Sequence, residues 1–196
     1  MTKIDRVCVF CGSNPGDHPD YARAAREVGT LLARESIGLV YGGGHRGLMG
    51  AIADAALAEG GHVIGVIPGH LEAREFAHQG LSDLRVVRTM HERKSMMADL
   101  SDGFVGLPGG LGTMEEFFEV ATWSQLGIHA KPAVLLNVRG YYDLVGRFLD
   151  HAVNEGFLLG EHRALIAICH EPGTILDALR SFTPSLEEKW LDRSER

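Results

Sequence analysis

Short apolar runs alternate with longer segments of helical periodicity along most of the chain. The apolar runs are rich in β-branched and aromatic residues and most end close to a glycine or proline, which is typical of buried strands. They span residues 6–11, 37–41, 62–67, 84–87, 103–107, 133–137 and 165–169. Near-continuous apolar strands that alternate with helices form parallel sheets covered on both faces. The pattern therefore predicts an α/β fold: a doubly wound, Rossmann-like domain with a mostly parallel sheet of about seven strands flanked by helices.

The segments between the strands carry helix signals. Pro19 suits the first turn of a helix that reaches about Glu35, and the helix after residue 107 is expected to begin near Met114. No linker or change of composition divides the chain. We expect residues 1–182 to form a single Rossmann-like nucleotide-binding domain, and residues 183–196 to form a polar C-terminal tail.

Composition narrows the class of protein. The 196 residues are 45% hydrophobic and 23% charged, as in a soluble globular protein. No segment approaches the roughly 18 uninterrupted apolar residues that a membrane span requires. The first residues lead directly into a strand and do not resemble a secretory signal, so we expect a cytoplasmic protein without membrane partners.

The charge balance bears on possible partners. With 19 Lys and Arg against 26 Asp and Glu, the net charge is −7 and no basic cluster exists to bind nucleic acid. Small phosphorylated ligands are still allowed, because they need only a local array of donors. The three cysteines fit a reducing compartment. Cys8 and Cys11 form a C-x-x-C, but they lie along a strand instead of opening a helix, which argues against a redox pair.

Two glycine-rich turns are candidates for phosphate binding. Residues 42–47 match G-x-G-x-x-G between a strand and a helix, yet the next strand ends without the acidic residue that dinucleotide folds place on the ribose. Residues 108–113, Pro-Gly-Gly-Leu-Gly-Thr, leave several backbone amides unobstructed at a helix start, where an anion is favoured. The spacing from Thr113 to Glu116 is also that of a capping box, and spacing alone leaves both interpretations open.

A cation near the start of another helix raises a functional question. Thr89 and Glu92 have capping-box spacing, which puts Arg93 in the first turn. There a positive charge opposes the helix dipole, at a cost of about 0.3–1 kcal/mol. Arg93 either forms an ion pair with Glu92 or Asp99, is solvated, or serves a site at the same edge of the sheet as Glu116.

These two segments together resemble one known family. The motif Met90-His91-x-Arg93-Lys94, combined with Pro108-Gly109-Gly110-x-Gly112-Thr113-x-x-Glu116, is similar to the Lonely guy family of cytokinin-activating nucleoside 5′-monophosphate phosphoribohydrolases. The resemblance extends from about Val7 to Glu155 and includes Cys11-Gly12-Ser13 and Tyr41-Gly42-Gly43-Gly44.

The resemblance implies hydrolysis of the N-glycosidic bond of adenosine 5′-monophosphate (AMP) or an N6-prenylated form, giving a free base and ribose 5-phosphate. It implies Glu116 as the catalytic carboxylate beside the ribose and Arg93 as the guanidinium that holds the sugar against it. It further implies substrate contacts by Ser13, Gly43, Gly44, Met90, Lys94, Met97, Pro108, Gly109, Gly110, Gly112 and Thr113. A homodimer is also implied.

Two other functions compete with this one. A nucleotide sensor without catalysis would use the same glycine turns. The family is often labelled lysine decarboxylase, but pyridoxal chemistry needs a Schiff-base lysine with cofactor-holding partners, and Lys94 is the single lysine near the site. We expect no cofactor and no metal: the ten histidines contain no H-E-x-x-H, and His70 and His78 are expected at the surface or an interface.

Overall fold

The computed structural model describes residues 3–72 and 77–183. The predicted tail therefore lies, apart from Thr183, outside the described residues. The strands are β1 (Arg6–Phe10), β2 (Gly38–Tyr41), β3 (Val63–Pro68), β4 (Asp83–Val87), β5 (Gly103–Gly106), β6 (Ala133–Leu136) and β7 (Ile166–Cys169). The α-helices are α1 (Pro19–Arg34), α2 (Gly47–Ala58), α3 (Gly69–Glu72), α4 (Met90–Asp99), α5 (Leu111–Gln125), α6 (Asp143–Asn154), α7 (Gly160–Arg163) and α8 (Ile175–Arg180).

The sheet has the predicted doubly wound topology. Its seven strands run in the order β4-β3-β2-β1-β5-β6-β7, and all neighbouring strands pair in parallel. The strand order reverses between β1 and β5, which pair from Val7–Gly103 to Phe10–Gly106. In such sheets the carboxyl ends of the two strands at the reversal open a crevice for ligands.

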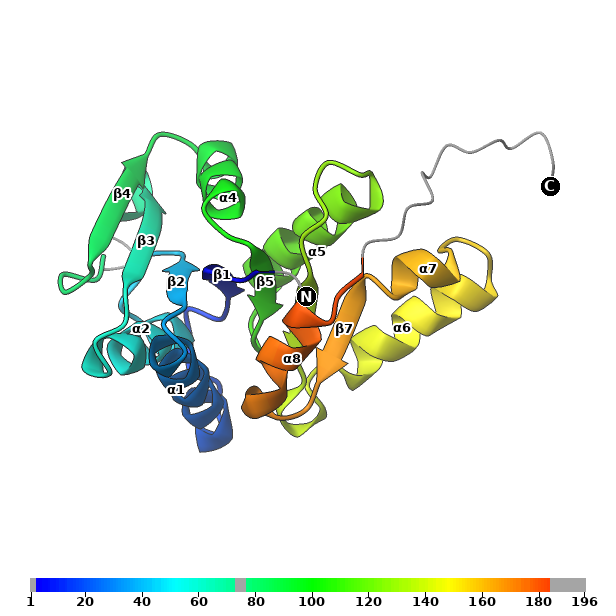
Figure 1. The fold of residues 1–196 in the computed structure, drawn as a ribbon, viewed down its shortest axis with the longest axis horizontal. Coiled ribbons are helices and arrows are strands. Elements are labelled where there is room, and N and C mark those ends of the chain that lie inside the picture. The colour runs from blue at the N-terminus through cyan, green and yellow to red at the C-terminus, as the bar shows by residue number, and fades with distance from the viewer. Residues whose placement is uncertain (1–2, 73–76, 184–196) are drawn as a thin grey trace.

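Helices cover both faces of the sheet, with α1 and α2 on one side and α4 and α5 on the other (Figure 1). Side chains of β1 alternate accordingly: Val7 and Val9 join the core under α1 and α2, whereas Cys8 and Phe10 join the core under α4 and α5. This period of two explains why the strands read as continuous apolar runs.

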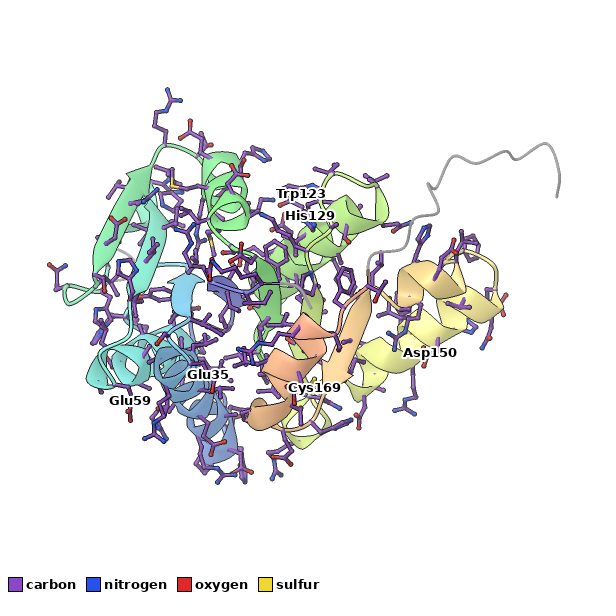
Figure 2. All side chains as sticks on the ribbon, in the orientation of Figure 1. Glu35, Glu59, Trp123, His129, Asp150 and Cys169 are labelled. Atoms are coloured by element: carbon purple, nitrogen blue, oxygen red, sulfur yellow. The ribbon has the colours of Figure 1, made fainter. Side chains whose placement is uncertain are left out.

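The observed boundaries differ from the prediction mainly at α5. This helix begins at Leu111, three residues before the predicted Met114, and Gly110 is its N-cap with extended backbone angles. The short helices α3 and α7 were not predicted, because four residues are too few to show helical periodicity. At the other end of α5, Trp123 and His129 lie beside each other, with ring centroids 6.4 Å apart (Figure 2).

The described cysteines are free thiols. Cys8 lies in β1 and Cys11 directly follows it, and burial raises the pKa of both thiols above the usual range, which keeps them protonated and argues against a redox pair. Within the described part of the chain, no helix combines the length and the apolar character needed to cross a bilayer.

Candidate active site

A cleft of about 340 Å³ opens where the central strands end. We call it the Arg93 cleft. It is lined by Val9, Phe10, Cys11, Gly12, Ser13, Gly42, Met49, Leu71, Met90, Arg93, Gly110, Leu111, Gly112, Thr113, Glu115 and Glu116. The ends of β1 and β2 thus meet the first turns of α4 and α5 beside the topological reversal.

Arg93 projects from the first turn of α4 toward the ends of two strands. Its Nε donates to the Val66 carbonyl at 3.0 Å and its Nη2 donates to the Gly42 carbonyl at 3.2 Å. Thr89 caps the helix through its hydroxyl, which accepts from the Glu92 amide. The guanidinium is therefore buried and held at a fixed place in the cleft wall.

The third side of the guanidinium faces a carboxylate. Arg93 Nη1 lies 3.4 Å from Glu116 Oε1, and the two side chains are 7% and 11% exposed. Glu92, a predicted structural partner of Arg93, instead pairs with Arg88. Removing one partner of a buried pair leaves an uncompensated charge, so each residue strongly constrains the other.

The capping-box interpretation of Thr113 and Glu116 is wrong. Because α5 begins at Leu111, Thr113 is the third helical residue and cannot be the N-cap. Gly110 is the cap and has no side chain to satisfy the first amides. Glu116 lies in the second turn of the helix, where its carboxylate turns into the cleft beside Arg93.

The start of α5 has the properties of an anion site. The amides of its first turn have no acceptor within the helix. A Cβ built on Gly110 or Gly112 would meet no atom within 4 Å, so space is open in front of these amides. Thr113 is buried and lines the same cleft. Its hydroxyl oxygen lies so close to Gly109 that a Cβ built on that glycine would be only 2.1 Å from it. Unobstructed amides at a helix N-terminus favour a phosphate or carboxylate.

Comparison with known proteins identifies the family. The chain is 49% identical over 184 residues to a probable cytokinin riboside 5′-monophosphate phosphoribohydrolase of Oryza sativa subsp. japonica, covering 94% of this chain and 81% of the relative. It is 49% identical over 176 residues to the cytokinin riboside 5′-monophosphate phosphoribohydrolase of Rhodococcoides fascians, covering 89% of each. The chain belongs to the Lonely guy family.

Two further matches agree with this family and with the fold. A family model described as "Possible lysine decarboxylase" matches residues 49–179. Among solved structures, the molybdenum cofactor binding protein of Rippkaea orientalis superposes with a TM-score of 0.68 at 21% identity, covering 92% of this chain and 98% of that one. At that identity the superposition supports the Rossmann-like fold alone.

The decarboxylase description does not fit Lys94, the predicted Schiff-base candidate. Its ammonium is buried, donates to the Glu119 carboxylate at 3.0 Å and is hydrogen-bonded to Glu115 as well. Burial alone would lower the pKa of Lys94, but the hydrogen bonds and charges of the two carboxylates outweigh it and raise that pKa above its usual value. A Schiff base requires a neutral amine, so this member of the Lonely guy family does not present Lys94 for pyridoxal chemistry.

The structure brings together only part of the predicted substrate-binding set. Ser13 and Met90 line the Arg93 cleft, as do Gly110, Gly112 and Thr113. Pro108 and Gly109 line a neighbouring hollow of about 270 Å³, which shares Gly12, Ser13 and Gly110 with the cleft.

Other predicted residues lie behind the cleft wall. Met97 is 1% exposed in the core beneath α4, and Lys94 is tied to its two carboxylates. Gly43 packs against Ile67 with a positive φ of 78°, and Gly44 forms a bridge with Ala77. These two glycines shape the turn that carries the Gly42 carbonyl to Arg93.

His78, which was expected at the surface or at an interface, is buried within the chain. Within the described residues, His45, Asp54 and His78 bring ligand atoms to within 4.8 Å of one another, which is the spacing of a candidate metal site. Nδ1 of His78 accepts from the Gly80 amide at 3.0 Å, so Nε2 carries the proton and donates to Asp54 at 2.8 Å. No lone pair of His78 is left for a metal, and the cluster fits a hydrogen-bonded structural group better.

Proposed function

We propose that the chain hydrolyses the N-glycosidic bond of an adenosine-type nucleoside 5′-monophosphate, releasing the free base and ribose 5-phosphate. The observation that carries the proposal is the Arg93–Glu116 pair, which lies in the same cleft as the open first turn of α5. The phosphoribohydrolase names of relatives at 49% identity support it.

The 5′-phosphate would bind at the start of α5. The amides of Gly110, Gly112 and Thr113 would donate to its oxygens, and the Thr113 hydroxyl would add a further donor. Ser13 lines the same cleft from the turn after β1. The helix dipole favours the negative charge at this end.

With the phosphate there, the ribose would lie against Glu116. Water attacks the anomeric carbon, the bond from that carbon to the base nitrogen breaks, and the bonding electrons leave with the base. The base takes up one proton and the attacking water loses one, so no net proton is released. Positive charge grows on the sugar ring during this step, so a fixed carboxylate beside it stabilises the transition state and accepts a proton from the water.

Arg93 would bind the sugar hydroxyls and hold the Glu116 carboxylate in place. Two of its nitrogens are committed to backbone carbonyls, which fixes the plane of the guanidinium that faces the substrate. A lysine could not make these contacts with one nitrogen. Met90, whose sulfur lies 3.9 Å from Arg93 Nη1, would contact the base.

The test is product analysis with AMP and with its N6-isopentenyl form. We expect both the free base and ribose 5-phosphate with at least one of the two nucleotides. Glu116→Gln should reduce turnover by at least about 100-fold while the protein stays folded and binds AMP. Wild-type protein that binds AMP in calorimetry without releasing base would instead support the sensor function.

We also propose that the protein acts as a homodimer. Leu111, at the mouth of the Arg93 cleft, is 92% exposed, which places an apolar side chain where a second copy could cover it. Light scattering on the purified protein should give twice the mass of 21.3 kDa. A monomer at micromolar concentration would contradict this proposal. The cytoplasmic location stays a prediction.

A further inference from the structure

Two consecutive tyrosines, neither of which lines the Arg93 cleft, bind carbonyls of the β5–α5 turn. Tyr141 Oη donates to the Gly109 carbonyl at 2.5 Å, and Tyr142 Oη donates to the Leu107 carbonyl at 2.7 Å. Both tyrosines lie between β6 and α6, more than 30 residues further along the chain. The Tyr141 ring lines the neighbouring hollow together with Tyr21.

These bonds complete a pattern along the turn. Every carbonyl from residue 107 to residue 110 accepts a hydrogen bond from a group outside the proposed phosphate site. The donors, in order, are Tyr142 Oη, the Gly12 amide, Tyr141 Oη and the Met114 amide. A carbonyl oxygen is partially negative, so turning these four away from the cleft removes groups that would repel a phosphate.

The bond to Gly109 also determines where an amide points. In a planar trans peptide the carbonyl and the following N–H point in opposite directions. Holding the Gly109 carbonyl toward Tyr141 therefore directs the Gly110 N–H away from Tyr141. Gly109 and Gly110 have no side chains to keep this peptide from rotating, so an external hydrogen bond has a large effect on its orientation.

Tyr141 is itself held in position by its own segment. Arg139 and Gly140 both have positive φ values, 54° and 71°, which turn the chain sharply before the helix. Asn137 accepts from the Tyr142 amide at 2.7 Å and donates to Asp143 at 2.6 Å. The backbone segment that carries Tyr141 is therefore fixed in position.

We propose that Tyr141 is a positioning residue, whose hydroxyl orients the Gly109–Gly110 peptide for binding of the substrate 5′-phosphate. This rests on the proposed function, because it assumes that the anion at the start of α5 is that phosphate. Tyr142 has a structural role, because its buried hydroxyl donates to the buried Leu107 carbonyl. Tyr141 is 42% exposed, so water can replace its hydroxyl at little cost in stability.

The experiment compares Tyr141→Phe with Tyr21→Phe. Both substitutions remove one hydroxyl from the same hollow, but within the described residues the Tyr21 hydroxyl makes no hydrogen bond, so Tyr21→Phe is the matched control. Dissociation constants for AMP and for adenosine are measured by calorimetry, with Glu116→Gln as the background if turnover interferes. KM and kcat for AMP are measured in the active protein.

We expect Tyr141→Phe to weaken AMP binding by about 5- to 10-fold, to leave adenosine binding unchanged, and to raise KM more than it lowers kcat. Tyr21→Phe should change none of these. Equal losses for AMP and adenosine, no loss for AMP, or the same loss in the control would overturn the inference. Wild-type protein that binds AMP without cleaving it would overturn the proposed activity, while the ratio of the two affinities would still decide the role of Tyr141. Failure to bind AMP at all would overturn both.

Discussion

Alanine at position 42 would place a methyl group in the space that the Arg93 guanidinium occupies. A Cβ built on Gly42 lies 2.1 Å from Arg93 Nη2, 3.3 Å from its Cζ and 3.2 Å from Met49 Sδ. Ordinary carbon contacts are about 3.5–4 Å, so the guanidinium must move by more than about 1 Å. That movement breaks the bond to the Gly42 carbonyl and shifts the partner of Glu116.

The expected loss of activity follows from this displacement. A misplacement of about 1 Å in a catalytic group costs on the order of 100-fold in rate, so kcat/KM for AMP should fall by about that factor in Gly42→Ala. The free energy of unfolding should fall by only about 1–3 kcal/mol, because the obstructing atoms are the end of one long side chain that can move. Base release measures the first quantity and denaturant unfolding measures the second.

A second glycine gives the control. A Cβ on Gly160 would meet no atom within 4 Å, and this residue has no positive φ. Gly160 is the first residue of α7, far along the chain from the residues of the cleft. Gly160→Ala should leave activity equal to that of wild type, and the free energy of unfolding should be unchanged or slightly higher. If Gly42→Ala is folded and retains activity within about threefold of wild type, the argument that Arg93 must stay in place for catalysis is refuted.

Two further predictions concern titratable groups. In Lys94→Met the Glu115 and Glu119 carboxylates lose their partner, so unfolding free energy at pH 7 should drop by about 1–3 kcal/mol. Because the pKa of Lys94 is raised, the stability that its charge adds is fully present below pH 10.5 and declines as pH rises from there through the raised pKa. A difference between wild type and variant that persists unchanged at pH 11.5 would contradict this. Burial lowers the pKa of His129 to about 4, so the native state should lose stability as pH falls below 6.5. Solvent reaches part of this side chain and weakens the effect, so we expect a loss of about 1–2 kcal/mol at pH 4. Unfolding of His129→Asn should show a smaller loss over this range, and equal losses would count against the assignment.

The fold was largely predictable because it depends on local patterns. Apolar runs mark each strand, and the alternation of Val7 and Val9 with Cys8 and Phe10 leaves no polar face, which already implies helices on both sides. The predicted start of α5 near Met114 is wrong because the helix has no hydroxyl side chain at its N-cap. The actual cap is Gly110, whose backbone angles leave no signal that distinguishes it from the other glycines of the turn.

The candidate site was predictable only in part. Motifs indicate Arg93 and Glu116, but their distance of 3.4 Å depends on how α4 and α5 pack on the sheet. The sequence marks Gly42 only as one glycine of a turn. In the structure its lack of a side chain also leaves room for the guanidinium of Arg93, 51 residues away. Tyr141 carries no motif, since its contact with Gly109 depends on two loops that meet only after the sheet has formed.

The phosphate site proposed for this acidic chain consists mostly of uncharged donors. Of the two basic side chains in the motif, Lys94 is neutralised by Glu115 and Glu119, and Arg93 faces Glu116. Neither leaves a net positive charge for a phosphate. In the proposed site the attraction comes from the amides at the start of α5 and from its dipole, whose strength depends on orientation and not on protonation. This is why the direction of the Gly109–Gly110 peptide matters: where charge is absent, the alignment of a few dipoles determines whether phosphate binds. It also makes the proposed phosphorylated substrate compatible with a net charge of −7.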